Sequence, residues 1–405
     1  MNRQKRTLYA VIGIIILLAA GMVYAWSVLS ISIGAFFTEW SKARLSTTFT
    51  ICMMCFCLGG MCGGMTAKKL NVKHSVWISG ALFLAGFLIA SAAQTTLVMY
   101  IGYGVLCGFA SGFAYNAAMS TVSAWFPDRQ GQISGILLMG FGLSSFVIGK
   151  VYQACTPSGA GVEAWRTSFR AFGIILAVIM AVCGCFFKRP EPGELEKLNI
   201  SGTKKKRADD GLELSTSEMI RRPSFWIFLI WTICLGASGM ALISQASGIA
   251  KEVGPQVEGG TIATVVGLIS IFNAIGRVFF GNLFDRKGRK VTMLLSGAAF
   301  AASAFILVFA LISHSFALIV IGFICCGFSY GGLTPSISAY VNASYGARHY
   351  AMNFSVMNLN LLVASFGSTI AGALYDAGGS YMAALFFIIG ACLLSIVCTL
   401  LIRKV

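Results

Sequence analysis

Residues 261–290 read TIATVVGLISIFNAIGRVFFGNLFDRKGRK, an apolar segment followed at once by a basic loop. The apolar part, Thr261–Phe284, is long enough to cross a bilayer as a helix. It contains Arg277, eight residues before Asp285, the first acidic residue past its end. Helical rise places Arg277 about 12 Å inside a hydrocarbon core of about 30 Å. A guanidinium at that depth is costly unless it faces a polar cavity or a partner, so the segment predicts a spanning helix with a polar site.

The rest of the chain is apolar in the same way. Of its 405 residues, 57% are hydrophobic and only 11% are charged, which favours the bilayer as solvent. No predicted span carries an acidic residue in its apolar part, so no resident carboxylate can pair with Arg277 there. The twelve predicted spans are Leu8–Phe37, Leu45–Ala67, Val76–Ala93, Leu97–Phe126, Ile133–Gln153, Phe169–Phe187, Phe225–Ile249, Thr261–Phe284, Val291–Ile312, Phe316–Val341, Met352–Leu374 and Tyr381–Ile402.

The basic residues indicate which side of the membrane each loop faces. The net charge is +16, a value that also occurs in nucleic-acid-binding proteins. However, if the N-terminus is cytoplasmic, most of the 30 lysines and arginines fall in segments on that side. The positive-inside rule therefore predicts that both termini are cytoplasmic, and we expect no nucleic-acid partner.

A single long polar interval divides the chain. We expect a six-helix bundle over residues 1–187, a cytoplasmic linker over 188–222 and a second six-helix bundle over 223–405. The halves repeat weakly, since Cys107-Gly108-Phe109 recurs as Cys326-Gly327-Phe328 and Gly63-Gly64-Met65 falls against Gly281-Asn282-Leu283. Subtracting the second offset, 218, from Arg277 gives Gly59, so the charge exists in one half only. A residue that serves the shared scaffold should recur, and the asymmetry therefore favours a ligand-binding role for Arg277.

The basic loop matches a known pattern. Residues 281–290 fit G-x-x-x-D-R-x-G-R-K in full, and the chain thereby resembles the major facilitator superfamily. The resemblance implies an all-α membrane protein with twelve transmembrane helices in two six-helix bundles. We expect Asp285 to sit near a helix N-terminus of the same half, where a carboxylate is favoured. Such a loop latches the cytoplasmic face, and the predicted gating residues are Asp285, Arg286, Gly288 and Arg289. In the first half, residues 63–73 lack the Asp, which leaves the latch role of that loop open.

A narrower resemblance is to the oxalate/formate antiporter family and related monocarboxylate porters. It rests on residues 21–27 (GMVYAWS), 125–131 (WFPDRQG), 217–219 (SEM), 225–226 (FW) and 273–277 (NAIGR). The resemblance implies that Arg277 binds a substrate carboxylate, for which a bidentate guanidinium is well shaped. Asn273 lies one turn away on the same face. The predicted substrate-binding residues are Arg277, Asn273, Tyr115, Tyr330, Tyr24, Trp26 and Met357, with packing as the alternative role for the tyrosines and helix–helix contact for Asn273.

Two departures from these relatives bear on the substrate. The oxalate porter carries a second cation, a lysine, in the eleventh helix, but residues 352–360 are uncharged here. One arginine matches one carboxylate, since a second negative charge in a low-dielectric site stays unbalanced. Animal monocarboxylate porters place an acidic residue where Asn273 stands, and an amide cannot carry a proton. Coupling is open between anion exchange and a proton that travels with the substrate.

We therefore expect a secondary transporter of small monocarboxylates such as lactate, pyruvate or formate, working by alternating access as a monomer in the bacterial cytoplasmic membrane. The alternatives are an oxalate/formate-type exchanger, an efflux pump for amphipathic compounds and a sensor that binds the anion without moving it. We expect no enzymatic activity, no cofactor and no metal site, because no suitable set of side chains occurs in the spans. The expected partners are the anion, a counter-anion or proton, and membrane lipids.

Two further features predict how the helices pack. Gly104, Gly108 and Gly112 share one face of the fourth span at four-residue spacing, which permits close helix approach. Pro335 removes a backbone hydrogen bond and should kink the tenth span.

Overall fold

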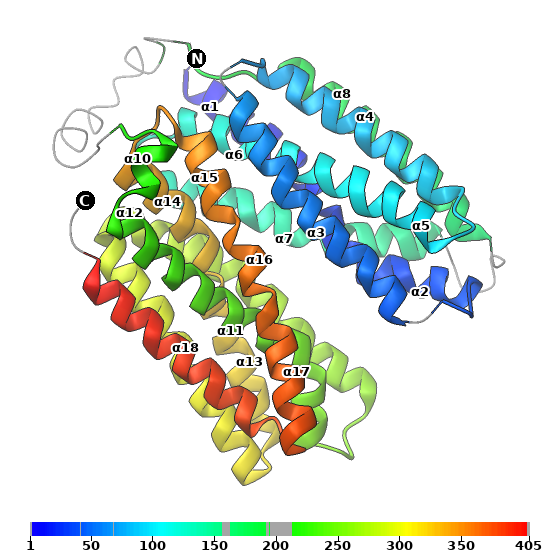
Figure 1. Cartoon of the computed structure of the whole chain (residues 1–405), viewed down its shortest axis with the longest axis vertical. Coiled ribbons are helices and arrows are strands. Elements are labelled where there is room, and N and C mark those ends of the chain that lie inside the picture. The colour runs from blue at the N-terminus through cyan, green and yellow to red at the C-terminus, as the bar shows by residue number, and fades with distance from the viewer. Residues whose placement is uncertain are drawn as a thin grey trace. The chain divides into compact units, whose positions relative to one another are not determined.

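The computed structural model describes residues 2–40, 42–67, 69–155, 163–191, 194 and 213–402. Every regular element within those ranges is a helix (Figure 1). The helices group by their contacts into two compact units, which are described separately.

The first unit is built mainly from the N-terminal half of the chain. It also takes in α7 from Gly140 onward and Ala351–Val356 at the start of α15. Within it α4 lies against α8, and α3 lies against α6. Its elements are α1 (Asn2–Ala20), the 3-10 turn η1 (Gly21–Ala25), α2 (Trp26–Phe36), α3 (Lys42–Thr66), α4 (Val72–Ser91), α5 (Thr96–Met99), the π-helical η2 (Tyr100–Cys107), α6 (Gly108–Trp125), most of α7 (Gln130–Cys155) and α8 (Ala164–Phe186).

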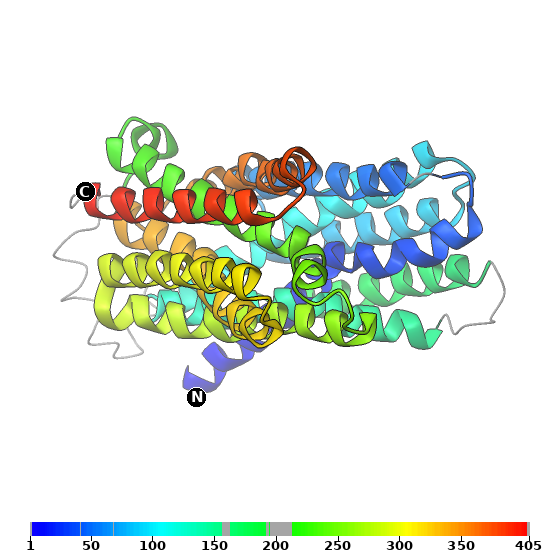
Figure 2. The same ribbon diagram turned by 90° about the horizontal axis from the view of Figure 1, so that it is seen from below.

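The second unit holds the C-terminal helices together with Arg129–Met139 at the start of α7. Within it α18 runs alongside the second part of α12 (Figure 2, red and yellow). Its elements are α10 (Thr216–Ile220), α11 (Pro223–Val253), α12 (Gly259–Ser313), α13 (Phe316–Tyr330), α14 (Leu333–Tyr345), most of α15 (Tyr350–Asn358), α16 (Asn360–Ala364), α17 (Phe366–Gly378) and α18 (Met382–Leu401). The contiguous division at 187 and 223 stays a prediction, because α7 and α15 each contribute to both units.

The predicted spans coincide with helices. Ten stretches of the described residues are long and apolar enough to cross a membrane, and one of them, Thr264–Ser313, covers two predicted spans. The two spans are parts of α12 that meet at Gly288, which has a φ of 77° and a ψ of 178°. A side chain is strained at that φ, so the glycine of the basic loop lets the chain turn there. The number twelve and the cytoplasmic termini stay predictions.

Both packing predictions are confirmed. A Cβ at Gly108 would meet the Cys52 carbonyl oxygen of α3, and one at Gly112 would meet that of Phe56, so α6 approaches α3 backbone to backbone. The tenth predicted span is divided between α13 and α14 by Gly331 and Gly332. The break falls at the residue four before Pro335, where the proline ring cannot accept a continuous helix.

Candidate functional site

Arg277 lies in the first part of α12 beside the start of α7. It is half-buried, and its Nη1 donates a hydrogen bond to the carbonyl oxygen of Leu138 in α7. The two backbones are close there, because a Cβ on Gly135 of α7 would meet the Arg277 carbonyl oxygen. Asn273, one turn earlier, is also buried. The guanidinium therefore contacts a neutral backbone acceptor in a narrow helix–helix junction within the second unit.

The end of α13 closes another side of this region. A Cβ on Gly331 would lie 2.8 Å from the backbone nitrogen of Arg277 and would also meet the Asn273 carbonyl oxygen. The preceding residue is Tyr330, whose ring lies over Gly239 of α11. The backbone at Tyr330 is thus next to Arg277, while its ring packs toward α11.

The position of Arg277 in the repeat differs by one residue from the sequence-based estimate. Gly276 faces the Phe328 carbonyl oxygen as Gly59 faces that of Phe109, so α12 corresponds to α3 at an offset of 217. The equivalent of Arg277 is therefore Gly60 and not Gly59. A single offset of 218 fails because each helix of the repeat has its own register: α13 corresponds to α6 at 219. The equivalent of Arg277 in the other half of the repeat is therefore still a glycine.

Asp285 binds the N-terminus of α7, an arrangement we call the Asp285 latch. Its Oδ1 accepts from the Gly131 nitrogen at 2.8 Å and its Oδ2 from the Gln132 nitrogen at 2.8 Å. A helix N-terminus was expected because its free N–H groups and dipole favour an anion. The expected helix of the same half was wrong, since α7 comes from the first half of the sequence. Gly131 and Gly281 make the contact possible, because a Cβ on either would meet the other's carbonyl oxygen.

The other predicted gating residues are Arg286, Gly288 and Arg289. Arg286 is exposed. Arg289 is half-buried, and its guanidinium lies 5.9 Å from the centroid of the Tyr340 ring. Gly288 provides the turn between the two parts of α12. The gating roles of these residues stay predictions.

The predicted aromatic residues of the first unit fall into two groups. Tyr115 is buried in α6 with its ring 5.1 Å from that of Phe141 and 5.8 Å from that of Phe354. Trp26 belongs elsewhere, with its Nε1 donating to the Leu45 carbonyl oxygen at 3.0 Å and its ring 4.6 Å from that of Tyr103. Within the second unit the structure thus brings the backbones of Asn273, Arg277 and Gly331 together and directs the Tyr330 ring to α11. Within the first unit Trp26 packs with Tyr103, and Tyr115 packs with Phe141 and Phe354.

Two predicted residues remain. The side chain of Tyr24 lies outside the described residues. Met357 is fully buried, and its carbonyl oxygen accepts from Asn360 Nδ2 at 2.8 Å. Its predicted contact with substrate stays a prediction.

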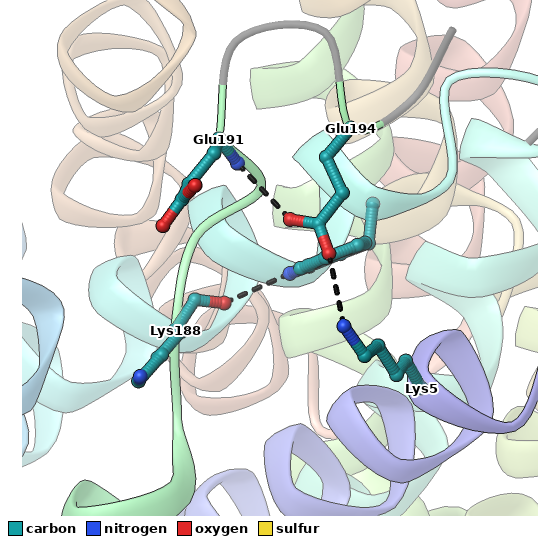
Figure 3. Close-up of polar contacts among 5 residues, drawn as sticks. Lys5, Lys188, Glu191 and Glu194 are labelled. Atoms are coloured by element: carbon teal, nitrogen blue, oxygen red, sulfur yellow. Dashed lines mark hydrogen bonds and ion pairs between the residues drawn. The ribbon is translucent and has the colours of Figure 1, made fainter. Parts of the chain in front are cut away.

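The start of the linker is held to the first unit by polar contacts (Figure 3). Trp125 Nε1 donates to the Lys188 carbonyl oxygen at 2.8 Å. Glu194 forms an ion pair with Lys5 at 3.4 Å and accepts from the Glu191 nitrogen at 3.3 Å. These contacts fasten α1 and α6 to the chain that leaves α8.

Arg189 adds to this attachment. Its Nη1 donates to the Ala67 carbonyl oxygen just after α3, and its Nη2 lies 3.5 Å from Ser120 Oγ. Burial lowers the pKa of the Arg189 guanidinium from its ordinary value, because desolvation disfavours the charged form. The guanidinium caps the end of α3, a favourable place for a cation.

Sequence reasoning missed the acceptor of Arg277 and a second polar contact in the first unit. The acceptor is a backbone carbonyl, and any residue can supply one, so Leu138 carries no sequence signal. The second contact joins Asn116 of α6 to Ser355 of α15. Asn116 follows the predicted Tyr115, but its partner lies 239 residues further along the chain.

Three relatives of known sequence match most of the chain. The Uncharacterized MFS-type transporter YhjX of Escherichia coli (strain K12) is 26% identical over 90% of this chain and 87% of its own length. The Oxalate:formate antiporter of Oxalobacter formigenes is 25% identical over 85% of this chain and 80% of its own. Monocarboxylate transporter 13 of Rattus norvegicus is 24% identical over 90% of this chain and 82% of its own.

Two solved structures share the fold. The proton:xylose symporter XylE superposes with a TM-score of 0.70 at 14% identity, covering 100% of this chain and 97% of its own. The transporter FucP in its outward conformation gives a TM-score of 0.70 at 14% identity, covering 98% and 100%. At that identity the likeness concerns the fold alone. The family model of the Major Facilitator Superfamily matches residues 11–365 and, in a second overlapping match, 246–405. A chain that matches this family along most of its length, and whose described elements are all helices, is a multi-pass membrane transporter and not an enzyme, and it belongs to the major facilitator superfamily.

Proposed function

We propose that this transporter carries small monocarboxylate anions, such as lactate, pyruvate or formate, with Arg277 pairing the substrate carboxylate. Two relatives that cover most of the chain support the substrate class, since their names include oxalate and formate in one case and monocarboxylates in the other. We place the protein in the plasma membrane of a bacterium, with one chain forming the complete pathway.

The observation that carries the proposal is the position of Arg277. A permanent cation stands deep in an apolar segment, and its Nη1 donates to the neutral Leu138 carbonyl. A carboxylate is the stronger acceptor for a guanidinium, because charge-assisted hydrogen bonds exceed neutral ones and two can form side by side. The anion can therefore replace the carbonyl as the acceptor of Arg277. Asn273, one turn away, supplies a further donor.

The uncharged stretch at residues 352–360 favours a single carboxylate over oxalate. In the described residues the stretch is mostly buried, and Asn353 is fully so. A dianion paired with Arg277 leaves one negative charge to be desolvated without a partner, which costs more than the first pairing gains. The oxalate/formate-type exchanger is the second candidate, favoured by the relative that carries that name.

Transport follows from alternate opening of the two sides around Arg277. The Asp285 latch holds α7 against α12 in the conformation described here, and the Leu138 carbonyl that binds Arg277 belongs to the same helix. When a carboxylate takes the place of Leu138 on Arg277, one tie between α7 and α12 is lost. Substrate binding then favours separation of α7 from α12, which is the coupling that alternating access requires.

The test is uptake into proteoliposomes of labelled formate, lactate, pyruvate and oxalate. We expect uptake of at least one monocarboxylate by the wild type, loss of most uptake in Arg277→Ala, and partial uptake in Arg277→Lys, which keeps the charge but not the fork. The matched control is Arg170→Ala, which removes an exposed arginine of α8 and should leave uptake unchanged. Full uptake by Arg277→Ala contradicts the site, and preference for oxalate favours the second candidate.

The same vesicles separate the two coupling modes. Anion exchange predicts that uptake rises when the vesicles are preloaded with unlabelled substrate and does not respond to an imposed pH gradient. Proton-linked transport predicts the reverse. Asn273 stands where a proton-carrying acid would adjoin Arg277, so either a counter-anion or a proton moving with the substrate must provide the driving force.

A further inference from the structure

Two helices, α7 and α15, each begin in one unit and continue in the other. Arg129–Met139, at the start of α7, packs in the second unit, and Ala351–Val356, at the start of α15, packs in the first. Each helix therefore contributes its first turns to one unit and its remainder to the other.

The two contacts match residue by residue. In the second unit a Cβ on Gly281 of α12 would meet the carbonyl oxygen of Gly131 in α7. In the first unit a Cβ on Gly64 of α3 would lie 2.8 Å from the carbonyl oxygen of Ala351 in α15. One turn further along, Gly135 faces the Arg277 carbonyl oxygen, while Ser355 Oγ donates to the Gly60 carbonyl oxygen at 2.7 Å. α12 corresponds to α3 at an offset of 217, and α15 corresponds to α7 at 220. The two contacts are thus repeats of one arrangement.

The matching contacts differ in what holds them. In the second unit a carboxylate, Asp285, binds the α7 N-terminus. The corresponding loop of the first half, residues 63–73, contains no acidic residue. The polar contact is made instead from α6, where Asn116 Nδ2 donates to the Ala351 carbonyl oxygen at 2.9 Å and to Ser355 Oγ at 2.6 Å.

Every donor in this contact is paired, and of its atoms only the buried Asn116 Oδ1 has no hydrogen-bond partner among the described residues. The two N–H groups of the Asn116 amide serve the Ala351 carbonyl and the Ser355 hydroxyl, and that hydroxyl in turn donates to Gly60. Asn116 is 1% exposed and Ser355 is 3% exposed. Buried polar groups of this kind are costly to leave without partners, so the contact is either closed as a whole or opened to a polar environment.

We propose that Asn116 and Ser355 form the latch of the first unit, in place of the acidic loop residue that this half lacks. The pair holds the start of α15 on α3 and α6 in one conformation of the transport cycle and releases it in the other. Asn116 adjoins Tyr115, and Ser355 adjoins Phe354, whose rings are stacked at 5.8 Å. Asn116 of the latch therefore directly follows Tyr115, a predicted substrate-binding residue, in the sequence. The latch acts in the transport cycle whichever anion is carried.

Hydrogen–deuterium exchange of the purified full chain tests the latch without a substrate. Asn116→Ala and Ser355→Ala should each speed exchange over residues 350–358 by about tenfold and leave residues 130–139 unchanged. The double variant should exceed neither single variant by much, because both changes open one contact. Asp285→Asn should give the opposite pattern, with faster exchange over 130–139 only.

The control is Ser111→Ala, which removes another buried hydroxyl of α6 that bonds the Ala20 carbonyl oxygen. It should leave residues 350–358 unchanged. Unchanged exchange there in both Asn116→Ala and Ser355→Ala overturns the proposal, as does equal acceleration along α4 and α18, which indicates general loosening. If Asn116→Ala does not fold, Ser355→Ala and Asn116→Ser carry the same test.

Discussion

At the scale of single residues, charge in an apolar segment was the feature that sequence could interpret. Arg277 and Asp285 are both recognisable because a fixed charge must find a partner or a polar space. What each contacts was harder to predict. Asp285 was expected at a helix N-terminus and lies at one, but the helix is α7 and not a helix of its own half. Arg277 binds the carbonyl of Leu138, a contact that depends on the backbone alone.

The Asp285 latch makes a testable contribution to stability. Asp285→Asn removes the charge and one of two acceptor oxygens, so one of the bonds to the Gly131 and Gln132 nitrogens is lost. We expect a loss of about 1–2 kcal/mol in unfolding free energy, seen as a lower midpoint in thermal unfolding. Lys287→Ala, an exposed change in the same loop, should leave the midpoint unaltered. Equal midpoints for Asp285→Asn and the wild type mean that the carboxylate does not hold α7.

At the scale of elements, helix positions were predictable and helix partners only in part. The apolar runs predicted the helices, and Pro335 predicted the interruption of the tenth span. The turn at Gly288 within α12 was not predicted. The four-residue spacing of glycines in η2 and α6 predicted a close neighbour, and the structure identifies that neighbour as α3. The exchange of the first turns of α7 and α15 between units was not predictable, because those turns look like the remainder of their helices in composition. The repeat offset failed by one residue since registers differ from helix to helix.

Close approach of α6 to α3 leaves no room for a methyl group at Gly112. A Cβ there would meet the Phe56 carbonyl oxygen and lie 2.8 Å from the Gly60 nitrogen. Gly112→Ala should therefore lower the unfolding free energy by about 1–3 kcal/mol, as overpacking does. The matched change Gly390→Ala in α18, where a Cβ meets nothing within 4 Å, should be neutral or slightly stabilising. Thermal unfolding of the two purified variants compares them, and equal effects mean that α6 is not tightly packed on α3.

At the scale of the whole molecule, the superfamily fold was predictable from one loop motif and the apolar runs. The substrate class was predictable only from the residues around Arg277, namely Asn273 and the uncharged stretch at 352–360. Asn273 lies one turn from Arg277 in α12, whereas the Tyr330 ring packs on α11 and Trp26 packs against Tyr103. The reason is physical. Aromatic residues in membrane helices pack as readily as they bind, so a motif position does not distinguish the two roles, whereas a buried charge has few alternatives.

Calorimetric titration of formate, lactate and oxalate into the purified protein measures whether Arg277 binds a carboxylate. Charge-assisted hydrogen bonds of the usual strength predict binding about 10- to 100-fold weaker in Arg277→Ala than in the wild type, with Arg277→Lys between them and Arg170→Ala unchanged. The same affinity for monocarboxylates in Arg277→Ala and the wild type would mean that Arg277 does not pair the substrate carboxylate.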